Sequence, residues 1–316
     1  MKYYVLSRSN YGIISNYMLS DLQKLENVEF VYEKDESNIS NNRYIRKIQR
    51  IIKQINYKIV RKNKLIKSII NDSYDSDNVK ILIATNEALQ EIEVSDLEYL
   101  RKNGIKVVLL MIDPMSAKYP SVSVAKEMIK NFKFDKIISF DPKDSKEYGY
   151  LYSNTLYSKF DVKNNNIDTD LYYVGNVKNR FEFLDFLKQE AKNNNVKPLI
   201  KLLGLNAEQK SELSQDEIIQ SYMPYDAMVE DLQRTKCILD ITQSGQSGIT
   251  LRYYEAVVYN KKLLTNNPNI KELPFYDERY MKIYKDIKDI DWDWIKNDEM
   301  PEYNYNGEFS PINLLD

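Results

Sequence analysis

Apolar residues gather in short continuous runs along the first half of this chain, and helical patterns separate the runs. The runs cover residues 2–7, 28–32, 79–84, 105–112 and 136–140. Apolar residues at helical spacing lie between them, at 13–25, 43–70, 95–102 and 122–132. Strands that are apolar on nearly every residue are typical of a parallel sheet covered on both faces. The pattern therefore predicts an α/β unit.

The same alternation restarts after a polar segment around residues 152–168. Strand-like runs recur at 171–174, 198–203, 237–241, 262–265 and 280–284, with helical patterns at 181–191, 225–234, 250–259 and 292–297. We therefore predict an α/β fold of two Rossmann-like domains, at residues 1–160 and 168–297, followed by a tail at 298–316. Because open α/β sheets bind ligands at the carboxyl ends of their strands, we expect those ends to face a cleft between the domains.

The composition excludes several kinds of chemistry. The 316 residues include one cysteine and no histidine, so the chain has no intramolecular disulfide, no histidine base, no Ser-His-Asp or Cys-His pair and no Cys/His zinc site. No apolar run approaches the ~20 residues of a membrane span. The first residues lack the pattern of an export signal. A cytoplasmic protein is therefore expected.

Charge is unevenly distributed although the net charge is only −2. Between Arg43 and Lys67 there are ten Lys and Arg and no acidic residue, which leaves 35 of the 45 basic residues against 47 acidic ones. A basic helical stretch on an acidic body favours an anionic surface partner. Two interpretations stay open: peripheral docking on the inner face of the cell membrane, and an ordinary solvated helix face. The acidic remainder and the lack of a reading motif argue against nucleic acid.

A loop at residues 243–248 holds two of the eight glycines and joins a predicted strand to a predicted helix. Backbone N–H groups and the helix dipole make such a turn an anion site. Ser244, Ser247 and Thr250 add hydroxyl donors. The spacing of the glycines matches neither the P-loop nor the dinucleotide fingerprint.

The helix that follows this loop carries two charged candidates. Arg252 lies in the first turn, where a positive charge is unfavourable unless an anion meets it. Glu255, three residues later, can accept hydrogen bonds from the two vicinal hydroxyls of a ribose. The alternative is a plain turn followed by an ordinary Arg252–Glu255 helix pair. A second glycine turn, Gly175 and Asn176, ends the first strand of the second domain, and Arg180 after it could reach a diphosphate.

The region from residue 221 to 276 resembles bacterial glycosyltransferases of the GT-B architecture, particularly those of capsule, exopolysaccharide or lipopolysaccharide assembly. Tyr225 and residues 237–241, 246–256, 262–267 and 274–276 carry the resemblance, and residues 170–175 and 180–181 fit it. It covers about the C-terminal half. It implies a nucleotide-sugar donor in the C-terminal domain, with Glu255 on the ribose and the loop from Gln246 through Ser247 and Gly248 to Thr250 on the pyrophosphate.

The resemblance leaves the stereochemistry open. Many retaining members carry a glutamate eight residues before the ribose glutamate, where this chain has Ser247. The resemblance also implies that the tail from residue 298 crosses back to brace the N-terminal domain.

Tyr222 and Tyr225 are the candidates for stacking on the base of the nucleotide, and the alternative is that both are core or surface tyrosines.

The N-terminal domain supplies the candidates for catalysis. Asp113 follows the most apolar strand and is the candidate general base of an inverting reaction, with a turn aspartate before Pro114 as the alternative. Asn10 and Tyr11, after the first strand, are candidates for holding the acceptor. Three Asp-x-Asp triplets, at 75–77, 168–170 and 291–293, do not follow strands. We interpret them as caps and loops and expect no metal.

Together these features predict transfer of a sugar from a nucleotide diphosphate, with a UDP-sugar expected, to a hydroxyl of a surface glycan or lipid-linked acceptor. No cofactor beyond this co-substrate is expected. Two alternatives stay open. One is a non-catalytic nucleotide- or glycan-binding partner with the same fold. The other is a transferase of a phosphate-containing group, which would share the anion loop.

Overall fold

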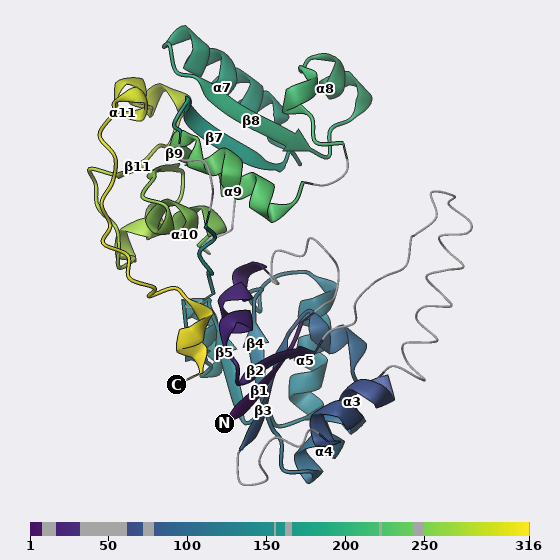
Figure 1. The fold of residues 1–316 in the computed structure, drawn as a ribbon. Coiled ribbons are helices and arrows are strands. Elements are labelled where there is room, and N and C mark those ends of the chain that lie inside the picture. The colour runs from purple at the N-terminus through teal and green to yellow at the C-terminus, as the bar shows by residue number, and fades with distance from the viewer. Residues whose placement is uncertain are drawn as a thin grey trace. The chain divides into compact units, whose positions relative to one another are not determined.

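The computed structural model describes residues 1–7, 17–31, 62–71, 79–154, 156–161, 166–220, 223–242 and 249–315. The chain forms two compact units (Figure 1). The first unit contains Met1–Ser158 and Phe309–Asp316, and the second contains Lys159–Glu308. Each unit has its own parallel sheet, so the predicted α/β class with two successive units is confirmed.

The first unit is built on six parallel strands in the order β2-β1-β3-β4-β5-β6. These are β1 Lys2–Leu6, β2 Val28–Val31, β3 Lys80–Thr85, β4 Lys106–Met111, β5 Lys136–Ser139 and β6 Leu151–Tyr152. One face packs against α3 (Lys62–Asn71), α4 (Val94–Lys102) and α5 (Pro120–Asn131), which lie along one side of the sheet in Figure 1. The helices η3 (Ala88–Glu91) and α6 (Pro142–Tyr148) follow β3 and β5.

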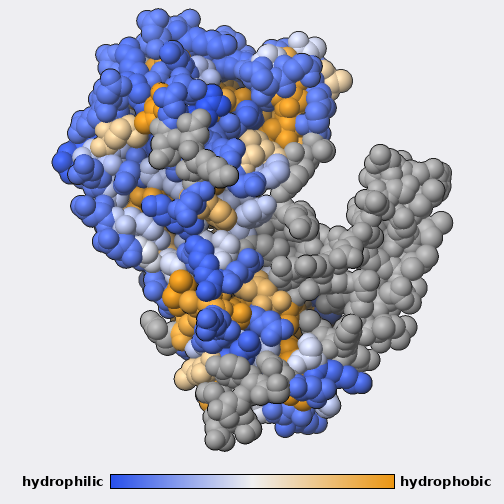
Figure 2. Space-filling model, in the orientation of Figure 1, coloured by the Kyte–Doolittle hydropathy of each residue, from blue (hydrophilic) through white to orange (hydrophobic). Residues whose placement is uncertain are grey.

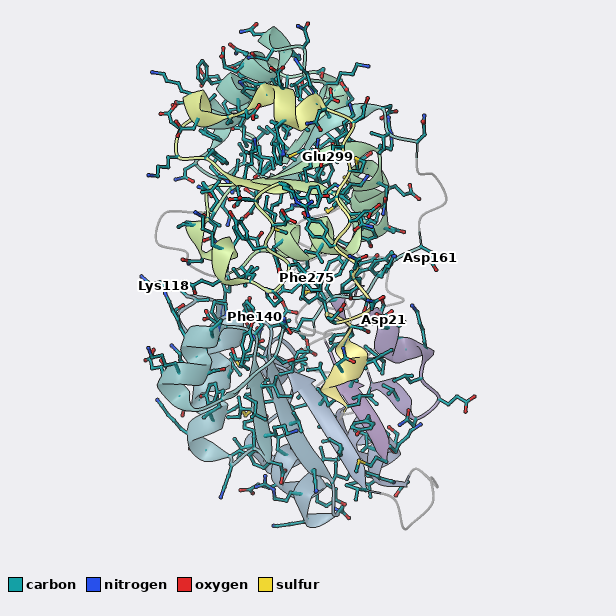
Figure 3. All side chains as sticks on the ribbon, turned by 90° about the vertical axis from the view of Figure 1, so that its left-hand side faces the viewer. Asp21, Lys118, Phe140, Asp161, Phe275 and Glu299 are labelled. Atoms are coloured by element: carbon teal, nitrogen blue, oxygen red, sulfur yellow. The ribbon has the colours of Figure 1, made fainter. Side chains whose placement is uncertain are left out.

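The other face of this sheet is covered from both ends of the chain. It packs against η1 (Ser20–Lys24) and the residues around η7 (Pro311–Leu314). Tyr3 Oη donates to the carbonyl of Leu315 at 2.6 Å, and Ser310 Oγ donates to Asp21 Oδ2 at 2.8 Å. Figure 3 labels Asp21 beside this yellow C-terminal turn. Residues 309–315 therefore pack onto the first unit, with Phe309 and Pro311 buried.

The second unit has five parallel strands in the order β11-β10-β9-β7-β8. These are β7 Thr169–Asn176, β8 Pro198–Leu203, β9 Thr235–Asp240, β10 Lys262–Thr265 and β11 Met281–Ile283. On one face lie α7 (Phe181–Asn193) and α11 (Trp292–Lys296), and on the other α9 (Tyr225–Gln233) and α10 (Leu251–Val258). Shorter turns connect these elements: α8 Ala207–Ser211, η4 Gln215–Glu217, η5 Pro268–Glu272 and η6 Ile287–Asp289. The surface of this unit is mostly hydrophilic in the view of Figure 2.

The two sheets share one topology. Numbered within its own unit, each sheet begins in the doubly wound order 2-1-3-4-5. The strand order reverses between β1 and β3 in the first unit and between β7 and β9 in the second. Crevices at the carboxyl ends of such strands, where the order reverses, are where open α/β sheets bind ligands. The second unit's reversal point is therefore the first place to look for a site.

Three features depart from the sequence pattern or lie beyond it. The short helix α6 and strand β6 lie where the sequence pattern predicted no helix or strand. Within the predicted helix at 13–25, residues 17–18 are α-helical and the 3-10 turn η1 follows them, whereas residues 13–16 lie outside the described residues. Of the basic stretch, residues 43–61 lie outside the described residues. No helix in the described ranges is long and apolar enough to cross a bilayer.

Candidate functional site

Arg180 joins the two strands that flank the reversal point of the second unit. Its Nη1 donates to the carbonyl of Ile241, just beyond β9, and its Nη2 donates to the carbonyl of Asn176 at the end of β7, both at 2.8 Å. The guanidinium carbon lies 5.8 Å from the centre of the Tyr173 ring. Its Nε is buried without a hydrogen-bond partner, and among the described residues no carboxylate pairs with it. A guanidinium held at strand ends without a counter-charge is suited to an anionic ligand.

Gly175, Asn176 and Arg180, predicted together, form one turn at the end of β7. A Cβ on Gly175 would lie 3.2 Å from Tyr173 Oη, so a larger residue there would require that hydroxyl to shift by a few tenths of an ångström. Asn176 Oδ1 accepts from the backbone N–H of Lys178 at 3.0 Å, which closes the turn. The turn therefore places Arg180 at the strand end, and the close approach of the Tyr173 hydroxyl favours glycine at position 175.

Of the predicted site residues that the structure describes, Glu255 is the most enclosed, with 1% of it exposed. Its Oε1 accepts from the hydroxyl of Tyr225 at 2.8 Å, and its Oε2 accepts from Arg252 Nη1 at 2.5 Å. Tyr225 is 3% exposed, and its ring packs edge-on against Phe160 at 5.8 Å. Tyr225 therefore orients the carboxylate in this structure. The predicted ribose role of Glu255 and base-stacking role of Tyr225 stay predictions.

Arg252 turns back from the first turn of α10 against the sheet. Besides Glu255, it contacts the carbonyl of Val174 through Nη2 at 2.6 Å, and its guanidinium carbon lies 5.4 Å from the centre of the Tyr172 ring. Burial opposes its charge, but the Glu255 carboxylate raises the pKa of Arg252 above its ordinary value. The i,i+3 pair considered from the sequence is present; its Glu255 side chain is buried and its Arg252 side chain is 17% exposed.

Thr250 caps α10 and connects it to a residue that the sequence did not single out. Thr250 Oγ1 accepts from the N–H of Arg252 at 3.2 Å and donates to Asp240 Oδ1 at 2.9 Å. Thr265 Oγ1 donates to the other oxygen of Asp240 at 2.7 Å. Burial raises the pKa of Asp240, although the two threonine hydroxyls act in the opposite direction. Asp240 interrupts the apolar run predicted at 237–241, and a carboxylate beside the carboxyl end of a parallel strand was the only available signal.

Seven predicted site residues lie outside the described residues, and the structure does not place them. In the second unit these are Tyr222 and four positions of the loop, Ser244, Gln246, Ser247 and Gly248. In the first unit they are Asn10 and Tyr11. Their roles stay predictions.

Asp113 lines a hollow of about 320 Å³ within the first unit, just beyond β4. Its Oδ2 accepts from Asn86 Nδ2 at 2.8 Å and from Ser121 Oγ at 3.2 Å. Asn86 is fully buried, and its own Oδ1 accepts from the N–H of Ile112 at 2.7 Å. Asp113 is therefore held by Asn86, which links the ends of β3 and β4, and by Ser121 in the first turn of α5. This restraint is what a positioned proton acceptor requires.

The described Asp-x-Asp triplets have structural roles. Asp168 pairs with Arg234, which lowers the pKa of Asp168, and Asp170 accepts from the N–H of Lys197. Asp291 caps α11 by accepting from the N–H of Trp294 at 3.0 Å. Within the described ranges, no group of three or more Cys, His, Asp or Glu lies close enough together to hold a metal.

No protein-family model and no curated protein sequence matches the chain. Three solved structures similar to it are the lipopolysaccharide outer core galactosyltransferase WaaB in its apo form, T4 phage BGT in complex with UDP-glucose, and the glycotransferase of kitacinnamycin. The respective identities are 14%, 13% and 10%, with TM-scores of 0.44, 0.43 and 0.45. The matches cover 92%, 93% and 93% of this chain and 88% of each other chain. The fold assignment itself rests on the strand order of the two sheets.

Proposed function

We propose that this protein is a glycosyltransferase that moves a sugar from a nucleotide-diphosphate donor, expected to be a UDP-sugar, to a hydroxyl of a surface glycan or lipid-linked acceptor. The transfer would be metal-independent. The observation that carries the proposal is Arg180, an arginine without a carboxylate partner among the described residues, fixed at the reversal point of the second unit's sheet.

The second unit would hold the donor. Arg180 supports binding of the diphosphate, because guanidinium groups bind phosphate oxygens through charge-assisted hydrogen bonds. The capped N-terminus of α10, at Thr250, adds the positive end of a helix dipole. In this proposal the Glu255 carboxylate accepts from the ribose hydroxyls. Each of its oxygens accepts one hydrogen bond from the described residues and has lone-pair capacity for another.

The first unit would hold the acceptor and the base. Asp113 would take the proton from the acceptor hydroxyl while the oxygen of that hydroxyl forms a bond to the anomeric carbon. The bond from that carbon to the diphosphate breaks, and the nucleotide diphosphate leaves with the electron pair. This is the inverting course. A retaining reaction would leave Asp113 without this role.

The direct test is nucleotide binding and turnover by the full chain. We expect a UDP-sugar or free UDP to raise the melting temperature equally with and without EDTA, and the sugar nucleotide to be slowly hydrolysed. Arg180→Gln should weaken nucleotide binding by about tenfold or more, because a hydrogen bond to a charged group contributes roughly 1.5–3 kcal/mol. Arg279→Gln, an exposed arginine in the same unit, is the matched control and should bind normally.

The possible outcomes separate the alternatives. If no nucleotide shifts the melting temperature, or if Arg180→Gln binds as tightly as the original chain, the donor site is wrong. Binding without hydrolysis, and without transfer to any acceptor, would instead favour the non-catalytic partner. Loss of the shift in EDTA would remove the metal-independent mechanism.

A further inference from the structure

Asp240 joins three elements of the second unit, although it is not among the proposed donor contacts. It is the last residue of β9 and is 4% exposed. Its Oδ1 accepts from the hydroxyl of Thr250, which caps α10, at 2.9 Å. Its Oδ2 accepts from the hydroxyl of Thr265, the last residue of β10, at 2.7 Å. One buried carboxylate therefore links the carboxyl ends of two neighbouring strands to the start of a helix.

Each of the two threonine hydroxyls also receives a hydrogen bond from the backbone. Thr250 Oγ1 accepts from the N–H of Arg252 at 3.2 Å, and Thr265 Oγ1 accepts from the N–H of Asn267 at 3.1 Å. A hydroxyl group has one hydrogen to donate, and in both threonines this hydrogen is directed to Asp240. Residue 240 must therefore accept on both of its terminal atoms, and an ionised carboxylate does so.

An amide at position 240 would break this arrangement on one side. Asparagine has nearly the same shape as aspartate, but its NH2 group donates where a carboxylate oxygen accepts. The amide oxygen should stay with Thr265, because this residue is fully buried and its hydroxyl could not turn to solvent. The NH2 group would then face Thr250, which is partly exposed, and two donors would meet there. The start of α10 should therefore loosen before the end of β10 does.

We infer that Asp240 is a positioning residue of the donor site, which holds the first turn of α10 against the ends of β9 and β10 through the two threonine hydroxyls. The hold on α10 rests on these contacts alone, whereas its bearing on the donor rests on the proposed function. In that function the capped end of α10 meets the diphosphate, and Glu255 on the same helix accepts from the ribose. A binding constellation tolerates displacements of only about 0.5 Å, so a loosened α10 would bind the donor less well.

The hold on α10 can be measured without any ligand. Asp240→Asn should speed amide hydrogen exchange in the first turn of α10 by about fivefold, which corresponds to the loss of one N-cap, and should change exchange in η5 less. The matched control is Asp170→Asn. Asp170 is also buried, at 8% exposed, but it lies near the start of β7, where it accepts from the N–H of Lys197 and pairs with Lys236. This variant should leave exchange in the first turn of α10 unchanged, because such amides exchange by local opening.

The bearing on the donor is measured as the affinity for UDP, by calorimetry at a temperature at which melting curves show every variant to be folded. Asp240→Asn and Thr250→Val should each weaken binding by about fivefold, the same loss of one cap, and Asp170→Asn should not. The double variant should bind about as weakly as either single variant, because without the Thr250 hydroxyl the carboxylate no longer holds α10.

Kinetics separate positioning from a general loss of stability. In the hydrolysis of UDP-glucose, Asp240→Asn should raise KM while kcat falls by less than about twofold, because Asp240 touches neither the bond that breaks nor the proposed base. A variant that is merely less stable would instead lose kcat at an unchanged KM, because fewer molecules are folded.

Three results would overturn the inference: unchanged exchange at the start of α10 in Asp240→Asn, unchanged UDP affinity in this variant, or additive effects of Asp240→Asn and Thr250→Val. If Asp240→Asn does not fold, Thr250→Val removes the same link, and its exchange and affinity are read in the same way. If the original chain binds no UDP, the proposed function is what fails. Faster exchange in Asp240→Asn would then still support the hold on α10, and unchanged exchange would overturn that as well.

Discussion

Glu255→Gln should destabilise the second unit strongly, even without any ligand. The substitution keeps the shape of the side chain but removes its charge. Arg252, whose side chain is only 17% exposed, would then lose its carboxylate partner while staying mostly enclosed. Tyr225 would keep an oxygen to which it can donate. The predicted damage therefore comes mainly from one unpaired cation.

The magnitude follows from the contacts of Arg252. Removing one partner of a buried ion pair costs about 3–5 kcal/mol. Arg252 would retain its hydrogen bond to the Val174 carbonyl and its place near the Tyr172 ring, both of which still stabilise the charge. We therefore expect the lower end, a loss of about 3 kcal/mol in the free energy of unfolding. Glu255→Ala should cost more, because it also leaves a cavity.

The chain offers a convenient assay for this unit alone. Its only two tryptophans, Trp292 and Trp294, both lie in α11 of the second unit. Urea unfolding followed by tryptophan fluorescence therefore reports the second unit. The double variant Glu255→Gln with Arg252→Met closes a thermodynamic cycle, and it should be more stable than Glu255→Gln by about 1 kcal/mol or more because no buried charge is left unpaired.

A loss below about 1 kcal/mol for Glu255→Gln would refute this reasoning, because it would mean that Arg252 finds solvent or another partner at little cost. The reasoning would also be refuted if the change in unfolding free energy of the double variant equalled the sum of the changes for Glu255→Gln and Arg252→Met, because the two side chains would then have no coupling energy. The ribose role is measured separately, as nucleotide affinity under conditions in which the variant is fully folded. Retained affinity there would remove that role while leaving the structural one intact.

Two further predictions concern charge elsewhere in the chain. Burial lowers the pKa of Lys261 from 10.5 to about 8, so the folded state disfavours its charge and stability should rise as the pH increases from about 8 to about 10.5. Lys261→Met should therefore stabilise the second unit at pH 7 by about 2–3 kcal/mol and flatten this pH dependence. Equal urea midpoints for the variant and the original chain at pH 7 would contradict this prediction. Replacing the ten basic residues at 43–67 with Gln should reduce binding to anionic vesicles but spare transfer to a soluble acceptor, and unchanged vesicle sedimentation would remove the membrane hypothesis.

The sequence predicts the strands of this protein well because parallel strands are apolar on both faces. The run at 105–112 becomes β4, and the run at 262–265 becomes β10 with the same bounds. The pattern does not predict α6, because its sequence has no apolar stripe and its start, Asp141 before Pro142, serves equally well as a strand end. The start of α6 is instead stabilised by a helix cap, in which Asp141 Oδ1 accepts from the N–H of Lys143 at 2.8 Å.

The candidate site is predictable only where its residues are close in sequence. The Arg252–Glu255 pair follows from helical spacing, and the turn at Gly175 follows from the scarcity of glycine. The contact between Tyr225 and Glu255 joins two helices, and the hold of Asn86 on Asp113 joins two strand ends. Neither can be inferred from local spacing, because both depend on which strands become neighbours. Strand order is a tertiary choice that short-range patterns leave undetermined.

The return of residues 309–315 to the first unit sets an order on folding during synthesis. A ribosome makes the strands of the first unit early, and domains that are continuous in sequence usually fold as they emerge. Here the backbone N–H of Tyr157 donates to the carbonyl of Phe309 at 2.8 Å, and Phe309 is fully buried. That part of the first unit's core stays uncovered until the entire second unit has been translated. The first unit is thus begun first during synthesis but completed last. A nascent chain halted within the second unit would expose an apolar face of the first unit to chaperones.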